Sequence, residues 1–368
     1  MRCLRLYPSA WLFLAWTAAL LVPNRGLATD SPWPVYPLEP DAAWQLNLPD
    51  GQPFEASALT FTPDGALLTV SDRSPTVYRI LLPETPGAAD LVPDPHAFPA
   101  DQLRQVAPTP TGRYDCEGLA FDPQGRLYLC EEAQRWILRW DPHQHRVERL
   151  QIDWSPVQHF FSPWDRNASF EGIAIGNQRL YVANERQQGR IIEVDLESLE
   201  VLDSFEVRTH RNRPWDAHYS GLSWHNDRLY VLCRESRAVL QVDPRHRTVQ
   251  AEYDFASIER NPEWRYQVRL PLVGIMEGLA VDDRHIWLVT DNNHMPRERY
   301  PDDRRPTLFR CPRPDRPRRP RPRNRRCAYH ASNAPTAPYS GRVAASSRTY
   351  WSSGNNQRSA GASPSWRA

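Results

Sequence analysis

The chain contains no lysine, and all of its 45 basic residues are arginine. Together with 36 prolines, this bias is more typical of GC-rich coding than of selection for a function. Two catalytic signatures are absent as well. No Gly-x-Ser-x-Gly motif occurs, which argues against a hydrolase built on a nucleophile elbow. No helical His-x-x-x-His spacing offers zinc ligands.

Long apolar runs are absent after the N-terminus. The run from Ala10 to Val22 is too short to favour a membrane-spanning helix. Arginines precede it and small residues follow it up to Ala28, which predicts a cleaved signal peptide over residues 1–28. We therefore expect an exported protein, periplasmic or secreted, with no stable membrane insertion after cleavage. An uncleaved anchor is the alternative.

Acidic residues are scarce at the C-terminal end. Residues 311–368 carry 12 arginines and a single acid, Asp315, while the whole chain has a net charge of +1. The middle of the chain is therefore acidic, which favours a cation-binding surface and argues against nucleic acid as a partner. The Arg/Pro/Ser-rich tail predicts disorder; a basic interaction tail and an out-of-frame extension are the alternatives.

One sequence unit recurs along the chain. In its clearest copy, residues 115–141, three strand-like runs are separated by Asp/Pro/Gly turns, which indicates antiparallel hairpins. The copies begin roughly 50–60 residues apart, a spacing at or slightly above that of propeller blades. They begin near Ser57, Asp115, Phe170, Tyr219 and Met276.

This repetition predicts an all-β fold, a β-propeller over residues 29–310. Units of this kind cannot bury both faces alone and stack around a channel. A β-sandwich would also give short strands, but not the same unit five times. We expect five blades, or six if an irregular blade lies within residues 81–112 or 201–217. The lone strand at residues 43–48 is expected to pair with the last unit.

Cys116 and Cys130 mark the two ends of one predicted hairpin. Their sequence parity places them on one face. An exported protein could oxidise such a pair, or both could remain buried thiols.

Two positions of each unit carry a polar signal. Glu-Gly opens the first strand of three units, and acids or amides follow the second strand. In a propeller such positions converge near one mouth of the channel. The predicted ring comprises Glu117, Glu171, Glu277, Asp72, Glu185, Glu235, Asp291 and Asn292.

Clustered carboxylates raise one another's pKa, and a hard cation relieves the repulsion. Oxygen ligands favour Ca²⁺ or Mg²⁺ over zinc, so we expect calcium at this ring. Nearby arginines could hold an anionic group. The alternative is that Glu-Gly only hydrogen-bonds neighbouring backbone and joins the blades. His218 and His294, beside the expected mouth, are candidate acid–base groups.

The Glu277-Gly278-Leu279-Ala280 motif with Asp291-Asn292-Asn293 resembles the phytase-like propeller family, described as esterase-like activity of phytase. SdiA-regulated and strictosidine synthase/gluconolactonase-type propellers are more distantly similar. The resemblance covers residues 56–309 and implies a hydrolase of phosphate or carboxylate esters. Ser57 and Ser220 depart from the pattern by replacing the Glu of other units.

From the residues and the resemblance we expect a monomeric, calcium-assisted hydrolase of small anionic esters. Glu171, Glu277 and His218 are the expected catalytic residues. The substrate would be held by Arg113, Arg186, Arg234 and His294. The rival hypothesis is a non-enzymatic binding module that presents the aromatic loops 154–168 and 212–218 to a ligand or protein.

Overall fold

The computed structural model describes residues 31–94, 96–164, 168–185, 189–268 and 273–315. The predicted signal peptide, and the tail beyond residue 315, lie outside these ranges. The regular secondary structure of the described part is mostly β-strand, and most strand pairs are antiparallel. Within these ranges, no helix has the length and apolarity needed to cross a membrane.

Five consecutive units of strands account for most of the described residues. Unit 1 comprises β3 (Ala56–Phe61), β4 (Leu67–Ser71), β5 (Ser74–Leu81) and β6 (Gly87–Pro93). Unit 2 comprises β7 (Cys116–Phe121), β8 (Leu127–Glu131), β9 (Trp136–Asp141) and β10 (Arg146–Arg149). Unit 3 comprises β11 (Phe170–Gly176), β12 (Arg179–Asn184), β13 (Arg190–Asp195) and β14 (Val201–Phe205).

Units 4 and 5 follow the same plan, although unit 5 borrows its outer strand from the beginning of the chain. Unit 4 comprises β15 (Tyr219–His225), β16 (Arg228–Cys233), β17 (Ala238–Asp243) and β18 (Thr248–Asp254). Unit 5 comprises β19 (Met276–Val281), β20 (His285–Thr290), β21 (Thr307–Pro312) and β2 (Ala42–Asn47). The remaining elements are β1 (Val35–Pro37), α1 (Ala100–Val106), α2 (Ala256–Arg260) and a 3₁₀-helix at Ser155–Phe160.

The hairpin turns explain why the strands end where they do. In unit 2, Asp122 Oδ1 accepts hydrogen bonds from the backbone N–H groups of Gln124 and Arg126, both at 2.9 Å. Gly125 completes the turn with φ at +77°, a conformation that favours glycine. The turn chemistry visible in the sequence therefore sets the register of β7 against β8.

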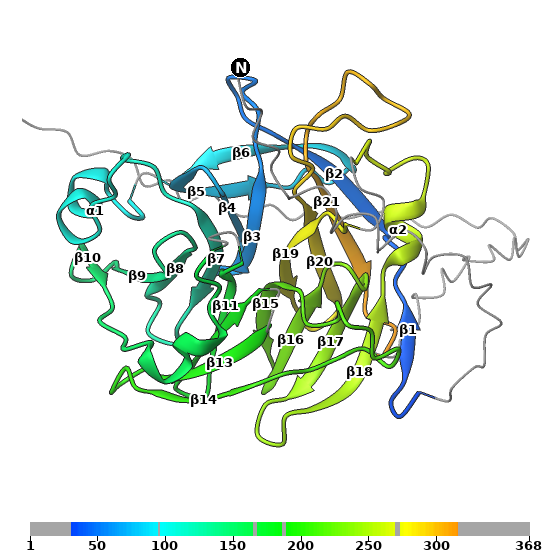
Figure 1. Ribbon diagram of the computed structural model, residues 1–368. Helices are drawn as coiled ribbons and strands as arrows, with labels where there is room; N and C mark the ends of the chain where they lie inside the picture. Colours follow the sequence, from blue (N-terminus) through cyan, green and yellow to red (C-terminus); the bar gives the residue numbers. More distant parts are fainter. Residues whose placement is uncertain (1–30, 95, 165–167, 186–188, 269–272, 316–368) are drawn as a thin grey trace, which may run out of the picture. The chain divides into compact units, whose positions relative to one another are not determined.

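The first strands of the units contact one another in a closed cycle. Contacts run from β3 to β7, β7 to β11, β11 to β15, β15 to β19, and from β19 back to β3. Figure 1 shows these strands gathered at the centre, with the later strands of each unit farther out. Each unit therefore presents its first strand to a common axis and its last strand to the periphery.

The predicted pairing of the lone N-terminal strand with the last unit is confirmed. Strand β2 pairs antiparallel with β21, with Ala43 opposite Phe309, and parallel with β6. The stretch between β5 and β7, where an irregular unit was conceivable, contains β6 and α1. Residues 201–217 supply β14, the outer strand of unit 3.

Apolar residues fill the spaces between neighbouring sheets. Cys116 packs with unit 1 and unit 2 residues, whereas Cys130 packs with residues of units 2 and 3. The prediction that these cysteines share one face is wrong, because a bulge at Glu117 shifts the alternation of the strand. Both thiols are buried and free.

Candidate functional site

A β-bulge interrupts the first strand of every unit at the same place. The pairing with the second strand skips one residue there, and the skipped residue is the Glu or Ser that the repeats share. An unpaired bulge residue turns its side chain away from the strand's regular alternation. These bulge positions are Ser57, Glu117, Glu171, Ser220 and Glu277.

The glycine after the bulge allows the first strands to approach closely. A Cβ on Gly172 would lie 2.9 Å from Gly221 Cα, and a Cβ on Gly278 would lie 2.8 Å from the carbonyl carbon of Ala58. The strands leave only about 10 Å³ of space on the axis, room for no more than about one water. A ligand of any larger size must therefore approach the bulge residues from solvent.

Two further positions of each unit lie beside the bulge. The pre-strand position, directly before the first strand, holds Glu55, Asp115, Ser169, His218 and Ile275 in units 1 to 5. The hairpin position, directly after the second strand, holds Asp72, Glu132, Glu185, Arg234 and Asp291. In units 2 to 5 the backbone N–H at the hairpin position donates to the carbonyl at the pre-strand position. We name the residues at these three positions the axial cluster.

Unit 2 contributes the tightest group of acids. Carboxylate oxygens of Asp115, Glu117 and Glu132 lie within 4.8 Å of one another. Burial, reinforced by the charge of Asp115, raises the pKa of Glu132 to about 9. Burial and the charges of Glu277 and Glu132 raise the pKa of Glu117 well above its usual range. The protonated forms of Glu117 and Glu132 are therefore favoured when no cation is present.

Glu171 and Glu277 are the buried carboxylates of the neighbouring bulges. Burial, together with the charges of Glu185 and Glu117, raises the pKa of Glu171 well above its usual range. Burial also raises the pKa of Glu277 to about 8, although Arg234 opposes the shift. Both groups can therefore carry a proton at neutral pH.

Arg234 brings a buried positive charge into the cluster. It forms ion pairs with Glu277 and Glu185, and its Nε lies 3.3 Å from Glu235 Oε1. His218 Nδ1 lies 3.4 Å from Glu235 Oε2. Burial raises the pKa of Glu235, but His218 and Arg234 outweigh it and leave that pKa lowered. Basic side chains therefore partly offset the carboxylates around unit 4.

In units 1 and 5, basic side chains lie beside acids of the axial cluster. Arg73 pairs with Glu55, and His294 Nε2 lies 3.1 Å from Glu55 Oε1. Burial and the charge of Glu55 raise the pKa of Asp72 to about 7. Burial raises the pKa of Asp291 to about 6, although a backbone hydrogen bond opposes the shift. These two acids thus titrate near neutral pH.

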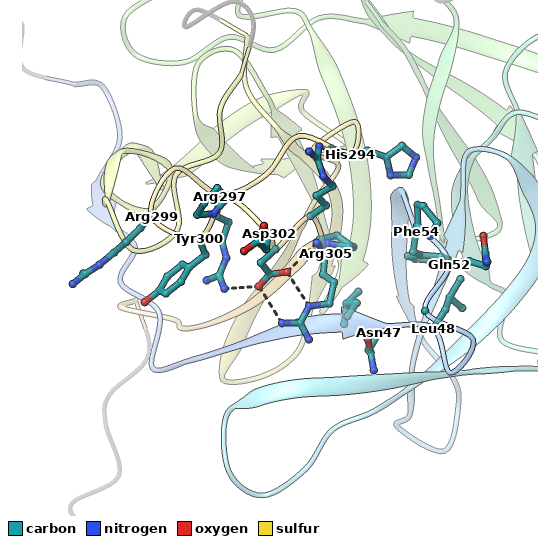
Figure 2. A pocket seen from close by; sticks show the side chains of 17 residues that line it. Asn47, Leu48, Gln52, Phe54, His294, Arg297, Arg299, Tyr300, Asp302 and Arg305 are labelled. Carbon is teal, nitrogen blue, oxygen red and sulfur yellow. Dashed lines mark hydrogen bonds and ion pairs between the residues drawn. The ribbon is translucent and has the colours of Figure 1, made fainter.

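A cavity of about 770 Å³ adjoins this region. The connection from β2 to β3 and the segment between β20 and β21 line it. Figure 2 shows His294 and Phe54 on one side and Arg299 and Tyr300 on the other. His294 thus contacts both the cavity and a carboxylate of the axial cluster.

Most of the predicted ring residues converge at the axial cluster. They are Glu117, Glu171, Glu277, Asp72, Glu185 and Asp291. Glu235 lies at the rim, paired with Arg234 and His218. Asn292 Nδ2 donates to the carbonyls of Met295 and Arg304 at 2.7 and 2.9 Å, which shapes the cavity wall.

The predicted anion-binding arginines are placed differently from one another. Arg234 has both terminal nitrogens engaged by carboxylates. Arg113 is exposed, and among the residues that the structure describes it forms no ion pair with the cluster. Arg186 lies outside the described residues.

Sequence reasoning missed Glu55, Asp115 and Glu132. Glu132 follows Glu131, and the pair could not be resolved without the strand register. Aligning the residue after each second strand would have selected Glu132, because Glu185 and Asp291 occupy that place in other units. For Glu55 and Asp115, the signal was their shared position directly before the first strand of a unit.

Known structures with a similar fold include the glutaminyl cyclase of Myxococcus xanthus. It is 16% identical, with a TM-score of 0.50, and the match covers 76% of this chain and 97% of that one. Another is virginiamycin B lyase from Staphylococcus aureus, which is 15% identical with a TM-score of 0.39 over 74% of this chain and 75% of that one. The cyclase is a propeller-type protein, so its likeness shows a propeller-type fold.

Sequence relationship is more specific than the structural likeness. Among curated proteins, none matches the chain significantly. The sequence profile of the phytase-like family, described as esterase-like activity of phytase, matches residues 52–294. These residues include every position of the axial cluster, from Glu55 to Asp291. The chain therefore belongs to the phytase-like family.

Proposed function

We propose that this protein is an exported five-bladed propeller hydrolase of phosphate or carboxylate esters, assisted by Ca²⁺ at the axial cluster. Units 1 to 5 correspond to the blades, since their first strands close a cycle. The observation that carries the proposal is the excess of carboxylates converging at one end of the axis. Export rests on the sequence of residues 1–28.

The donor set suits a hard cation. Asp115, Glu117 and Glu132 offer oxygen ligands only, which favours Ca²⁺ over zinc. Within the described part of the chain, Glu132 Oε1 is buried without a hydrogen-bond partner. Buried oxygens of this kind are costly unless a proton or a cation satisfies them. These residues therefore support a bound cation.

Chemistry at the cluster would divide between the cation and the buried acids. When bound, the cation polarises a phosphoryl or acyl oxygen. Glu277, with its pKa raised to about 8, can exchange a proton near neutral pH, as a general acid or base requires. Glu171 can hold a proton for a leaving alcohol, because burial and neighbouring acids raise its pKa.

Substrate access is possible only from the solvent side. Asp115, Glu117 and Asp291 are half-buried and lie toward solvent, whereas Glu171 is buried. The cavity beside His294 could accept the alcohol portion of an ester, while the reacting group meets the carboxylates. We assign no substrate contact to Arg234, whose guanidinium is occupied.

Hydrolysis of p-nitrophenyl phosphate and p-nitrophenyl acetate, with EDTA or with millimolar Ca²⁺, tests the proposal. We expect calcium-dependent turnover of at least one ester, strongly reduced in Glu171→Gln and Glu277→Gln. The control is Glu193→Gln on strand β13, away from the cluster, which should retain activity. Unchanged calcium binding and turnover in both cluster variants would overturn the proposal.

A binding module is the second candidate, favoured by exposed aromatic side chains. Trp164 is 93% exposed and Trp215 is 36% exposed, each on a long loop before a first strand. This alternative expects no turnover of any ester. It also expects that Trp164→Ala and Trp215→Ala reduce retention of a partner, measured by pull-down from the cell envelope.

A further inference from the structure

The hairpin position changes charge in a single unit. Four units place an acid there: Asp72, Glu132, Glu185 and Asp291. Unit 4 places Arg234 at the same point of the fold, with the same backbone hydrogen bond to the pre-strand residue. The arginine is therefore a charge reversal within a repeated backbone frame.

Arg234 binds carboxylates from three units at once. Its Nη1 pairs with Glu277 of unit 5, its Nη2 with Glu185 of unit 3, and its Nε with Glu235 of unit 4. The side chain is buried, so these contacts are little screened by water. Gathering carboxylates from separate segments is what a divalent cation does in a protein. An arginine carries that charge permanently.

The opposite half of the cluster has no such cation. Asp115, Glu117 and Glu132 form no ion pair with an arginine among the described residues. Glu132 is only 3% exposed, and its Oε1 has no hydrogen-bond partner there. A buried oxygen without a partner, within reach of two other carboxylates, is an independent indication of a ligand.

We propose that Arg234 is a built-in cation that limits the axial cluster to one divalent ion, held by Asp115, Glu117 and Glu132. Arg234 occupies one carboxylate oxygen each of Glu185 and Glu277, so a second ion would have to displace the guanidinium in that half. It also repels a second ion by its own charge. The inference rests on the calcium binding in the proposed function and adds its stoichiometry and location.

Removing Arg234 should open a second ion site beside Glu277 and Glu235. In Arg234→Gln the side chain keeps much of its length but loses its charge. The oxygens of Glu277 and Glu235 that Arg234 held then become available as donors. Arg73→Gln is the matched control, because Arg73 also pairs with acids of the cluster but is 65% exposed.

Isothermal titration calorimetry with CaCl₂ on the purified full chain tests this count, after EDTA has been removed. We expect one ion for the unmodified protein, one for Arg73→Gln and two for Arg234→Gln. A single ion bound with unchanged affinity by Arg234→Gln would overturn the inference while leaving the proposed function intact. Two ions in the unmodified protein would also overturn it. No calcium binding at all would remove the calcium part of the proposed function as well.

A second variant guards against poor folding of Arg234→Gln. Glu132→Arg copies the unit 4 arrangement into unit 2, and it should abolish calcium binding while circular dichroism shows an intact fold. Retention of one ion by Glu132→Arg would overturn the location. If Arg234→Gln is unfolded in EDTA, its recovery of the native spectrum on adding CaCl₂ supports the second site, and failure to recover counts against it.

Discussion

Units 2 and 4 share a backbone plan and differ in charge at every equivalent place. The three positions hold Asp115, Glu117 and Glu132 in unit 2. In unit 4 they hold His218, Ser220 and Arg234. Both first strands carry the same bulge and both hairpin positions make the same backbone hydrogen bond. The backbone therefore supplies a repeated frame, and the side chains decide the chemistry.

The serine of unit 4 shows what the bulge does when no acid is present. Ser220 Oγ donates to the carbonyl of Met276 at 2.9 Å, which ties unit 4 to unit 5. The alternative role considered for the Glu-Gly motif, joining neighbouring units, therefore describes this serine well. Glu117 instead lies among carboxylates that repel it. Structural and functional roles thus occupy the same position in different units.

The most severe change would give unit 4 the acid of unit 2. In Arg234→Glu, Glu185 and Glu277 lose their buried ion pairs with Arg234 and meet another carboxylate. We expect the free energy of unfolding in EDTA to fall by about 3–5 kcal/mol, the usual cost of breaking a buried ion pair. Urea unfolding measures it.

Arg247→Glu is the control for that variant. Arg247 lies in the same unit, at the turn before β18, and is 42% exposed in its pair with Asp203. Its effect should stay within about 1 kcal/mol, as for other exposed pairs. Equal losses of unfolding free energy in the two variants would show that the buried ion pairs of Arg234 stabilise the fold no more than an exposed pair does.

Substitutions at the bulge positions of units 2 and 4 test the proposed calcium site. In Glu117→Gln a ligand of the proposed ion is lost, so added calcium should no longer raise the melting temperature. The stabilisation expected in the unmodified protein is about 2.7 kcal/mol at 100 times the dissociation constant. Ser220→Ala alters the same position in unit 4 and should leave the calcium shift unchanged. A calcium shift that survives in Glu117→Gln would contradict the assignment.

The need for glycine after the bulge can be tested by comparison with unit 1, which has alanine at that position. Gly172→Ala places a Cβ against the backbone of Gly221, so we expect a loss of about 1–3 kcal/mol from overpacking. Ala58 already occupies the equivalent place in unit 1, and Ala58→Gly should cost no more than about 1 kcal/mol. Thermal unfolding compares the two, and equal costs would show that close strand approach is not limiting.

The last comparison is a gradual pH dependence of stability without calcium. The pKa values of Glu132, Glu277 and Asp72 are raised to about 9, 8 and 7, from about 4 in an unfolded chain. The folded state therefore binds protons more tightly. Its extra stability is complete below about pH 4 and is lost as pH rises through 7 to 9.

Melting temperatures in EDTA should accordingly fall between pH 5 and pH 9. Calcium should flatten this fall, because the ion replaces protons on the same oxygens. Glu132→Gln should also make the slope shallower. A melting temperature that is constant or rises over this range in EDTA would contradict the raised pKa values.

Sequence periodicity was sufficient for the inner part of each unit. The first three strands have strong apolar runs and clear turns, as in β7 to β9. The outer strands were mostly missed because they are short and polar: β10 is Arg146–Arg149, and β14 is largely half-exposed or exposed. Outer strands at a sheet edge bury little, so their sequences carry little alternation.

The site was predicted as a ring of acids, but its asymmetry was not. A bulge changes strand parity by one residue, and no composition signal marks it; the misplaced face of Cys116 has the same cause. Whether Arg234 points toward a substrate or toward its neighbours depends on contacts between units 3, 4 and 5. Those contacts join residues tens of positions apart, which a single sequence does not reveal.

The seam between β2 and β21 has a consequence for how the molecule is made. Asp41 and Arg310, 269 residues apart, form an ion pair across it. Closing so long a loop delays this pairing until nearly the whole domain has been synthesised. Until then, the edges of β2 and β20 that β21 will occupy stay open, and open strand edges invite pairing with other chains. The emerging chain should therefore depend on chaperones until its last strand arrives.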